Sequence, residues 1–152
     1  MYDFIDQRVT TLDRGGQFLV WSMRNWVLAI HNRQCPPNAI GPAFAKWGMI
    51  GALPHFHMAM MILSKEGANS LQFSPVGCMQ ISDDEAMMLA LFRSLRDDLP
   101  DQVRAMTELL VTEGFAAPLF AALTAVSTRL AESSLIPEAP NRTGVPSSAP
   151  EK

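Results

Sequence analysis

The sequence of 152 residues contains few charged residues, few cysteines and no long apolar run. Charged side chains make up 18% of the chain, below the roughly 25% of an average soluble domain, so much of it is expected to be buried in a core or an interface. Two cysteines, Cys35 and Cys78, do not make a disulfide framework; with no export signal in view, we expect reduced thiols in a cytoplasmic protein. The best apolar segment, residues 49–63, is interrupted by Pro54 and is shorter than the about 20 residues of a membrane span, so no integral span is expected.

Motifs for nucleotide, nucleic-acid and metal chemistry are also missing. The chain has no glycine-rich phosphate loop, no nucleophile elbow, no His-Glu-x-x-His and no dinucleotide fingerprint. Residues 1–65 carry six Lys or Arg against three Asp, a net of +3, whereas residues 66–133 carry four Arg against ten Asp or Glu, a net of −6. Neither half is basic enough for a nucleic-acid partner. The positively charged first half and the negatively charged second half are instead expected to attract each other, either within one fold or between two copies.

The apolar residues that are present recur with helical spacing. In residues 13–33, Leu19, Met23, Trp26 and Ile30 form one stripe, which leaves Arg24 for the wetter face. Further helices are predicted over residues 38–48, 54–65, 83–98 and 100–114, and from about residue 118. No strand pattern competes with them. The predicted fold is therefore all-α: a single compact bundle of five or six helices over residues 1–133, with the first, third and fourth helices forming the core.

The most explicit helix start lies at Ser82. Its hydroxyl can accept from the backbone N–H of Glu85, whose carboxylate can accept from the N–H of Ser82, and this arrangement is a capping box. Two other helix starts are predicted from cap residues, one at Asn38 and one at Asp98. Pro42 would then lie in the early turns of its helix, where the missing donor costs little.

The composition changes at residue 134. Four prolines alternate with Ser, Ala, Gly and Asn over residues 134–152, and large apolar residues are almost absent. Such a segment cannot bury enough apolar surface to offset the entropy lost on ordering. We therefore predict a disordered Pro/Ser-rich tail over these residues.

Three side chains are candidates for ligand chemistry: His55, His57 and Cys78. Two histidines two positions apart on a helix diverge by about 200°, which favours a structural role for both. Cys78 precedes a helix start, and a Cys–His site would need one of these histidines beside it. A small enzyme or ligand-binding protein with its site around these three residues is therefore the alternative function. No Cys-x-x-Cys is present, so neither a metal nor another cofactor is predicted, and no catalytic residue is assigned.

The ten methionines give the leading hypothesis. Methionine adapts to irregular partners and is common on surfaces that bind apolar helices, although it also fills irregular cores. The candidate interface residues combine methionines with tryptophans: Trp21, Trp47, Met58, Met61 and Met87. We therefore expect a non-enzymatic interaction or regulatory module that forms a homo-oligomer or binds another protein.

Two segments carry a resemblance to a family. The first is Arg-Gly-Gly-Gln-Phe-Leu-Val-Trp at residues 14–21, and the second is Gly-Cys-x-x-Ile-Ser-x-Asp-Glu at residues 77–85. Over residues 14–95 the chain resembles small uncharacterised bacterial helical proteins. The resemblance implies a bacterial, cytoplasmic protein and attaches no activity, cofactor or partner to it.

Overall fold

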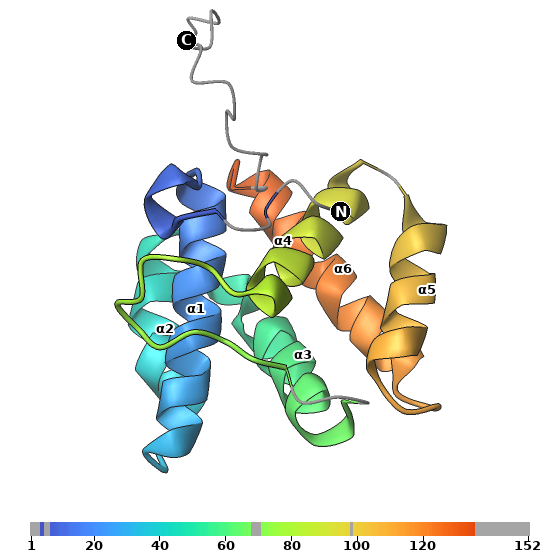
Figure 1. Cartoon of the computed structure of the whole chain (residues 1–152), viewed down its shortest axis with the longest axis horizontal. Helices are drawn as coiled ribbons and strands as arrows, with labels where there is room; N and C mark the ends of the chain where they lie inside the picture. Colours follow the sequence, from blue (N-terminus) through green and yellow to red (C-terminus); the bar gives the residue numbers. More distant parts are fainter. Residues whose placement is uncertain (1–3, 5–6, 68–70, 98, 136–152) are drawn as a thin grey trace, which may run out of the picture.

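The computed structural model describes residue 4 and residues 7–67, 71–97 and 99–135. The predicted cap at Asp98 and residues 136–152 of the predicted tail lie outside this part. The α-helices are α1 (Arg14–His31), α2 (Pro36–Lys46), α3 (Leu53–Glu66), α4 (Asp83–Arg96), α5 (Pro100–Leu110) and α6 (Ala116–Glu132), and two short 3-10 helices are η1 (Val9–Thr11) and η2 (Ile50–Ala52). The described residues contain no strand, so the all-α prediction is confirmed (Figure 1).

The centre of the bundle belongs to α6. This helix packs against α3, α4 and α5 (Figure 1). Its buried apolar residues are Leu119, Ala122, Leu123, Val126 and Leu130. The sequence prediction gave the core to the first, third and fourth helices and missed this role of α6. Its buried residues recur every three or four positions from Leu119 to Leu130, so one continuous face of α6 is covered by the neighbouring helices.

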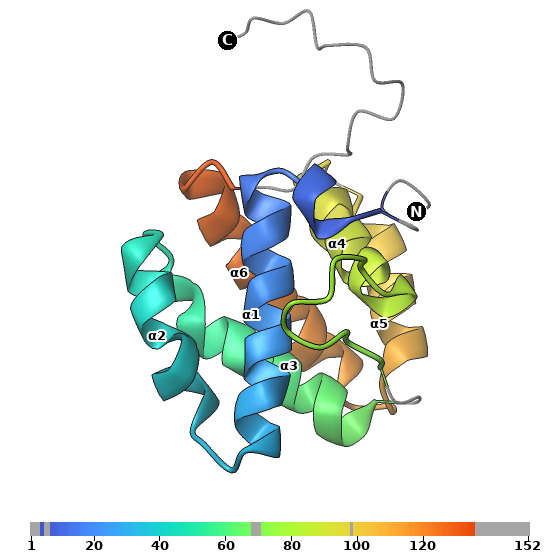
Figure 2. The same ribbon diagram turned by 60° about the vertical axis from the view of Figure 1, so that its left-hand side comes forward.

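The first helix packs mainly on α2 rather than on α3 or α4. Leu19, Met23 and Trp26 are buried as the stripe predicts, but Ile30 in the last turn is 44% exposed. The prediction that Arg24 faces water was wrong, because this residue is only 6% exposed. It is covered by an irregular segment, residues 71–81, which passes alongside α1 and ends at the start of α4 (Figure 2).

The predicted capping box at the start of α4 is confirmed. The backbone N–H of Glu85 donates to the Ser82 hydroxyl at 3.1 Å, and the N–H of Ser82 donates to the Glu85 carboxylate at 2.9 Å. The start of α2 differs from the prediction, because Cys35 and not Asn38 is its N-cap. Two prolines directly after Cys35 start the helix where no donor is needed. Pro42 therefore lies inside α2 and not in its early turns.

Three helices end in the same way, with a residue in the left-handed region. These residues are Arg33 after α1, Gly48 after α2 and Ser134 after α6, with φ of 58°, 75° and 57°. In each case the next backbone N–H reaches back into the last helical turn, as in a Schellman motif. After α6 that residue is Leu135, which is buried. The packed fold thus includes the first two residues of the segment that we predicted as tail.

Candidate functional site

A groove of about 520 Å³ lies between α1, α2 and the irregular segment 71–81, which we call the loop segment. Phe18 and Trp21 of α1 and Trp47 of α2 form its helical wall. Residues 76–79 of the loop segment form the opposite wall. No Asp or Glu lines the groove within the described part of the chain. Its volume is in the range of sites that bind small ligands or side chains of a partner.

The helical wall is a cluster of aromatic rings. The ring of Phe18 lies 4.9 Å from that of Phe44 and 5.3 Å from that of Trp47, measured between centroids. The Arg14 guanidinium covers the Trp47 ring at 5.1 Å. The Trp21 side chain is different, because 40% of this residue is exposed to solvent. The groove therefore presents an accessible indole on a rigid aromatic base.

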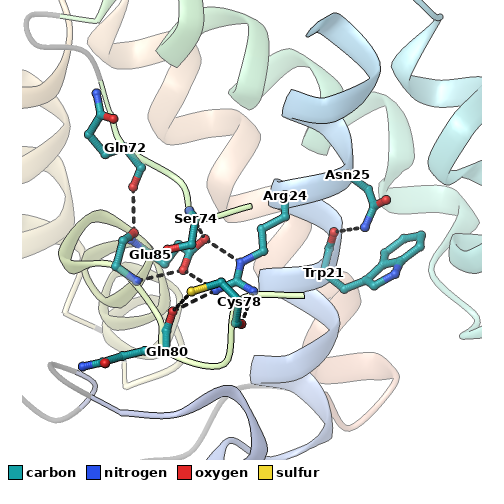
Figure 3. A network of polar contacts seen from close by, with 9 residues as sticks. Trp21, Arg24, Asn25, Gln72, Ser74, Cys78, Gln80 and Glu85 are labelled. Carbon is teal, nitrogen blue, oxygen red and sulfur yellow. Dashed lines mark hydrogen bonds and ion pairs between the residues drawn. The ribbon is translucent and has the colours of Figure 1, made fainter. Parts of the chain in front are cut away.

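The opposite wall is held by Arg24. Its guanidinium binds both carboxylate oxygens of Glu85 at 2.9 and 3.0 Å, and it also donates to the backbone carbonyls of Cys78 and Gln80 at 2.8 and 3.1 Å (Figure 3). Both charged side chains are buried, with 5% and 0% exposure. Planar, bidentate pairing of this kind is specific to arginine. A single side chain of α1 thus fixes the loop segment and the start of α4.

The Glu85 carboxylate connects further parts of the same region. It accepts from the backbone N–H of Ser74 and from that of Ser82, both at 2.9 Å (Figure 3). The Ser82 hydroxyl in turn donates to the carbonyl of Gln72 at 2.7 Å. These bonds compensate for the burial of the charges, which an isolated pair does only poorly. The loop segment consequently has a defined shape although it contains no regular secondary structure.

Sequence reasoning missed the partnership of Arg24 with Glu85. The two residues are 61 positions apart, and no spacing rule relates them. The capping box by itself accounts for a glutamate at position 85, and it gives no indication that a cation pairs with this side chain. The available signal was Arg24 itself, a charged residue inside an otherwise apolar helical run.

The three candidate ligand residues lie in different surroundings. Cys78 is half-buried and lines the groove, whereas neither His55 nor His57 lines it. His55 is exposed in the first turn of α3. The structure therefore does not bring the three side chains into one cavity.

His57 has a structural contact instead. The Trp26 indole N–H donates to its Nδ1 at 3.0 Å. Trp26 and Arg24 leave α1 in directions about 200° apart, so the contacts of His57 and of Cys78 lie on opposite sides of this helix. Burial lowers the pKa of His57 below its ordinary value of 6.5, because desolvation disfavours the charged imidazolium.

The five candidate interface residues are also distributed over separate places. Trp21 and Trp47 both line the groove. Met58 is 54% exposed on α3. Met61 and Met87 are partly buried against the core. The two tryptophans are therefore the candidates that share a concave surface.

A second cavity of about 330 Å³ lies on the other side of α1. Trp26, Met60 and Phe73 contribute to it, together with Gly67 at the edge of the described residues. This border adjoins residues 68–70, which lie outside the described part of the chain. Within the described residues, no group of three His, Cys, Asp or Glu is arranged to hold a metal ion.

No protein-family model, curated protein or solved structure matches this chain. Among the described helices, none combines the length and apolarity that crossing a bilayer requires.

Proposed function

We propose that the chain is a non-enzymatic interaction module that binds an apolar segment of a partner protein in the groove between α1, α2 and the loop segment. The observation that carries the proposal is the Trp21 indole, 40% exposed beside an aromatic base. Tryptophan combines a large apolar area with a polar N–H, and it is enriched among the residues that dominate binding energy at interfaces. A low share of charged residues, 18%, agrees with a chain that buries surface against a partner.

The rigidity of the groove supports binding. Arg24 ties the loop segment through the carbonyls of Cys78 and Gln80, so this wall is formed before a partner arrives. A preformed site loses less conformational entropy on association than one that must be ordered. The groove is thus suited to binding a partner without a large change in its own shape.

The lining of the groove favours binding over catalysis. The Cys78 thiol is present, but a cysteine nucleophile needs a base, and no histidine or carboxylate is among the described lining residues. The cations that line the groove are the exposed Lys46 and the buried Arg24, whose charge is paired with Glu85, and the amides are Gln17 and Asn25. This chemistry fits an apolar segment with negative charge at its edges.

The test uses anilinonaphthalene sulfonate, an apolar dye with one negative charge. The wild-type protein is expected to enhance the dye's fluorescence. Trp21→Glu removes the indole and adds a negative charge, so it is expected to weaken dye binding about tenfold or more, which corresponds to a loss of about 1.4 kcal/mol of binding free energy. Leu28→Glu is the matched control: Leu28 is 44% exposed on the same helix and does not line the groove. Circular dichroism verifies that both variants are folded. An absence of binding by the wild type, or equal losses in the two variants, contradicts the proposal.

A further inference from the structure

We infer that the partner is a second copy of this chain, whose corner between α5 and α6 enters the groove. This inference rests on the proposed function. We define the α5–α6 corner as residues 108–115. Docking of this corner would make each copy both a receptor, through its groove, and a ligand, through its corner.

The α5–α6 corner has the apolar chemistry that the groove fits. Leu109 is 72% exposed, the highest value among the large apolar residues that are exposed, and Phe115 is 38% exposed. The two residues lie six positions apart in the same corner, and exposed apolar residues that form a patch are typical of interaction sites. The corner therefore offers the anchor side chains that an aromatic groove accepts.

The charges of the two surfaces are complementary. Glu108 and Glu113, which flank Leu109 and Phe115, are both exposed. The groove is lined by the exposed Lys46 and by no acidic residue of the described chain. The corner also has cations nearby, Lys65 on α3 and Arg104 on α5, and Arg104 lies over the Phe120 ring of its own chain at 4.8 Å.

The same complementarity extends over the sequence. Residues 1–65, which supply the helical wall, have a net charge of +3, whereas residues 66–133, which supply the corner and also the loop wall of the groove, have a net charge of −6. Complementary potentials of this kind steer two surfaces toward one register. The helical wall of one copy is thus attracted to the acidic corner of another.

The corner is also a rigid element. Val111 pairs with Gly67 in an isolated bridge, and the backbone N–H of Thr112 donates to the Glu66 carbonyl at 2.9 Å. The N–H of Phe115 closes the turn on Thr112 at 3.1 Å. A corner that is already fixed loses little entropy when it docks.

The corner cannot fill the groove of its own chain. α2 and α5 lie at opposite ends of the molecule in both views (Figures 1 and 2). A single contact between the groove of one copy and the corner of the next pairs two different surfaces. Such a contact leaves one groove and one corner unfilled at the ends, so the assembly grows into a ring or a chain.

The test is sedimentation velocity over a concentration series of the full chain. The wild type is expected to form species larger than the monomer, and both Leu109→Glu and Trp21→Glu are expected to be monomeric. Met58→Glu is the control, because Met58 is 54% exposed and lies outside both surfaces. It is expected to associate like the wild type.

Mixing the two monomeric variants gives the decisive result. Leu109→Glu retains an intact groove and Trp21→Glu retains an intact corner, so an equimolar mixture has one functional interface and is expected to form dimers and nothing larger. A mixture that stays monomeric, or a Leu109→Glu variant that self-associates, overturns the inference. A second pair that avoids the apolar residues, Lys46→Glu with Glu113→Lys, is expected to associate more strongly when mixed than either variant does alone.

The outcomes separate this inference from the proposed function. If the wild type stays monomeric up to about millimolar concentration, self-association is excluded. Only an association free energy of about −4 kcal/mol or weaker would escape detection at that concentration. Dye binding that depends on Trp21 would then still support a groove for another protein. Loss of dye binding together with a monomeric wild type would overturn both.

Discussion

The two walls of the groove are built on different physical principles. The helical wall consists of rings that pack on one another, Phe18 with Phe44 and with Trp47. The loop wall has no regular secondary structure and is held by the buried pair of Arg24 and Glu85. Apolar packing divides its stabilisation among many small contacts, whereas the polar wall concentrates it in one pair of charges. The loop wall should therefore be the more sensitive of the two to a single substitution.

The largest expected effect comes from removing the cation of the loop wall. Arg24→Met leaves the Glu85 carboxylate buried without its partner, so the free energy of unfolding should fall by about 3–5 kcal/mol. Urea denaturation measures this loss. Adding Glu85→Gln to the same chain removes the buried charge and should recover about 1 kcal/mol or more.

The control for this prediction is an exposed ion pair. Arg129 lies 3.4 Å from Glu132, and the two side chains are 53% and 60% exposed. Arg129→Met should therefore lower the free energy of unfolding by less than about 1 kcal/mol. Equal losses for Arg24→Met and Arg129→Met would show that the loop wall does not depend on the buried pair.

A smaller effect is expected where the helical wall meets the end of α6. A Cβ at Gly15 in the first turn of α1 would overlap the backbone carbonyl of Leu135, which cannot move as easily as a side chain. Gly15→Ala should lower the free energy of unfolding by about 1–3 kcal/mol, the usual cost of overpacking. Thermal unfolding followed by circular dichroism measures it.

The adjacent glycine provides the comparison. A Cβ at Gly16 would meet side-chain atoms of Asp13 and Leu12 at 3.2 Å, and these can shift by a few tenths of an ångström. Gly16→Ala should therefore be the milder substitution. If Gly16→Ala proves the more damaging of the two, the contact between the start of α1 and Leu135 is less important than the structure indicates.

The smallest effect concerns the side of α1 opposite Arg24, where the Trp26 indole N–H donates to His57. Burial lowers the pKa of His57 in the folded state, so the unfolded chain binds more protons as the pH falls below 6.5. The contribution of His57 to stability is thus present above pH 6.5 and is lost as the pH falls through the lowered pKa. The urea midpoint should decrease over this interval.

Variants at the two histidines isolate this contribution. His57→Asn keeps an acceptor for the Trp26 indole and removes the titration, so the urea midpoint should depend less on pH than in the wild type. His55→Asn, at an exposed position, should leave the dependence unchanged. An identical pH dependence in His57→Asn and the wild type would assign the effect to other groups.

The features predicted from the sequence are those determined by neighbours along the chain. The capping box of Ser82 and Glu85 involves residues three positions apart, and the structure confirms both of its bonds. The buried stripe of α1 and the all-α class likewise follow from helical spacing. The prediction was less accurate where two helix starts were compatible with the local sequence. Asn38 was predicted as the N-cap of α2, but the prolines directly after Cys35 start this helix earlier.

The candidate site could be predicted only in part. The sequence selected Trp21, Trp47 and Cys78, which all line the groove, but for reasons that did not place them together. It also selected His55 and His57, which lie outside the groove. Spacing along a helix specifies which residues share a face. It does not specify which distant segment covers that face.

The sequence by itself determined the helices and the start of α4, because each depends on bonds between residues at most a few positions apart. Only the tertiary structure decided that α6 is central, that Arg24 is buried and that an aromatic groove forms beside it. In each case the deciding contacts join segments that are far apart in the chain, as in the buried ion pair. A charged residue is stable in the interior only where the fold delivers its partner, and Glu85 reaches Arg24 from 61 positions away.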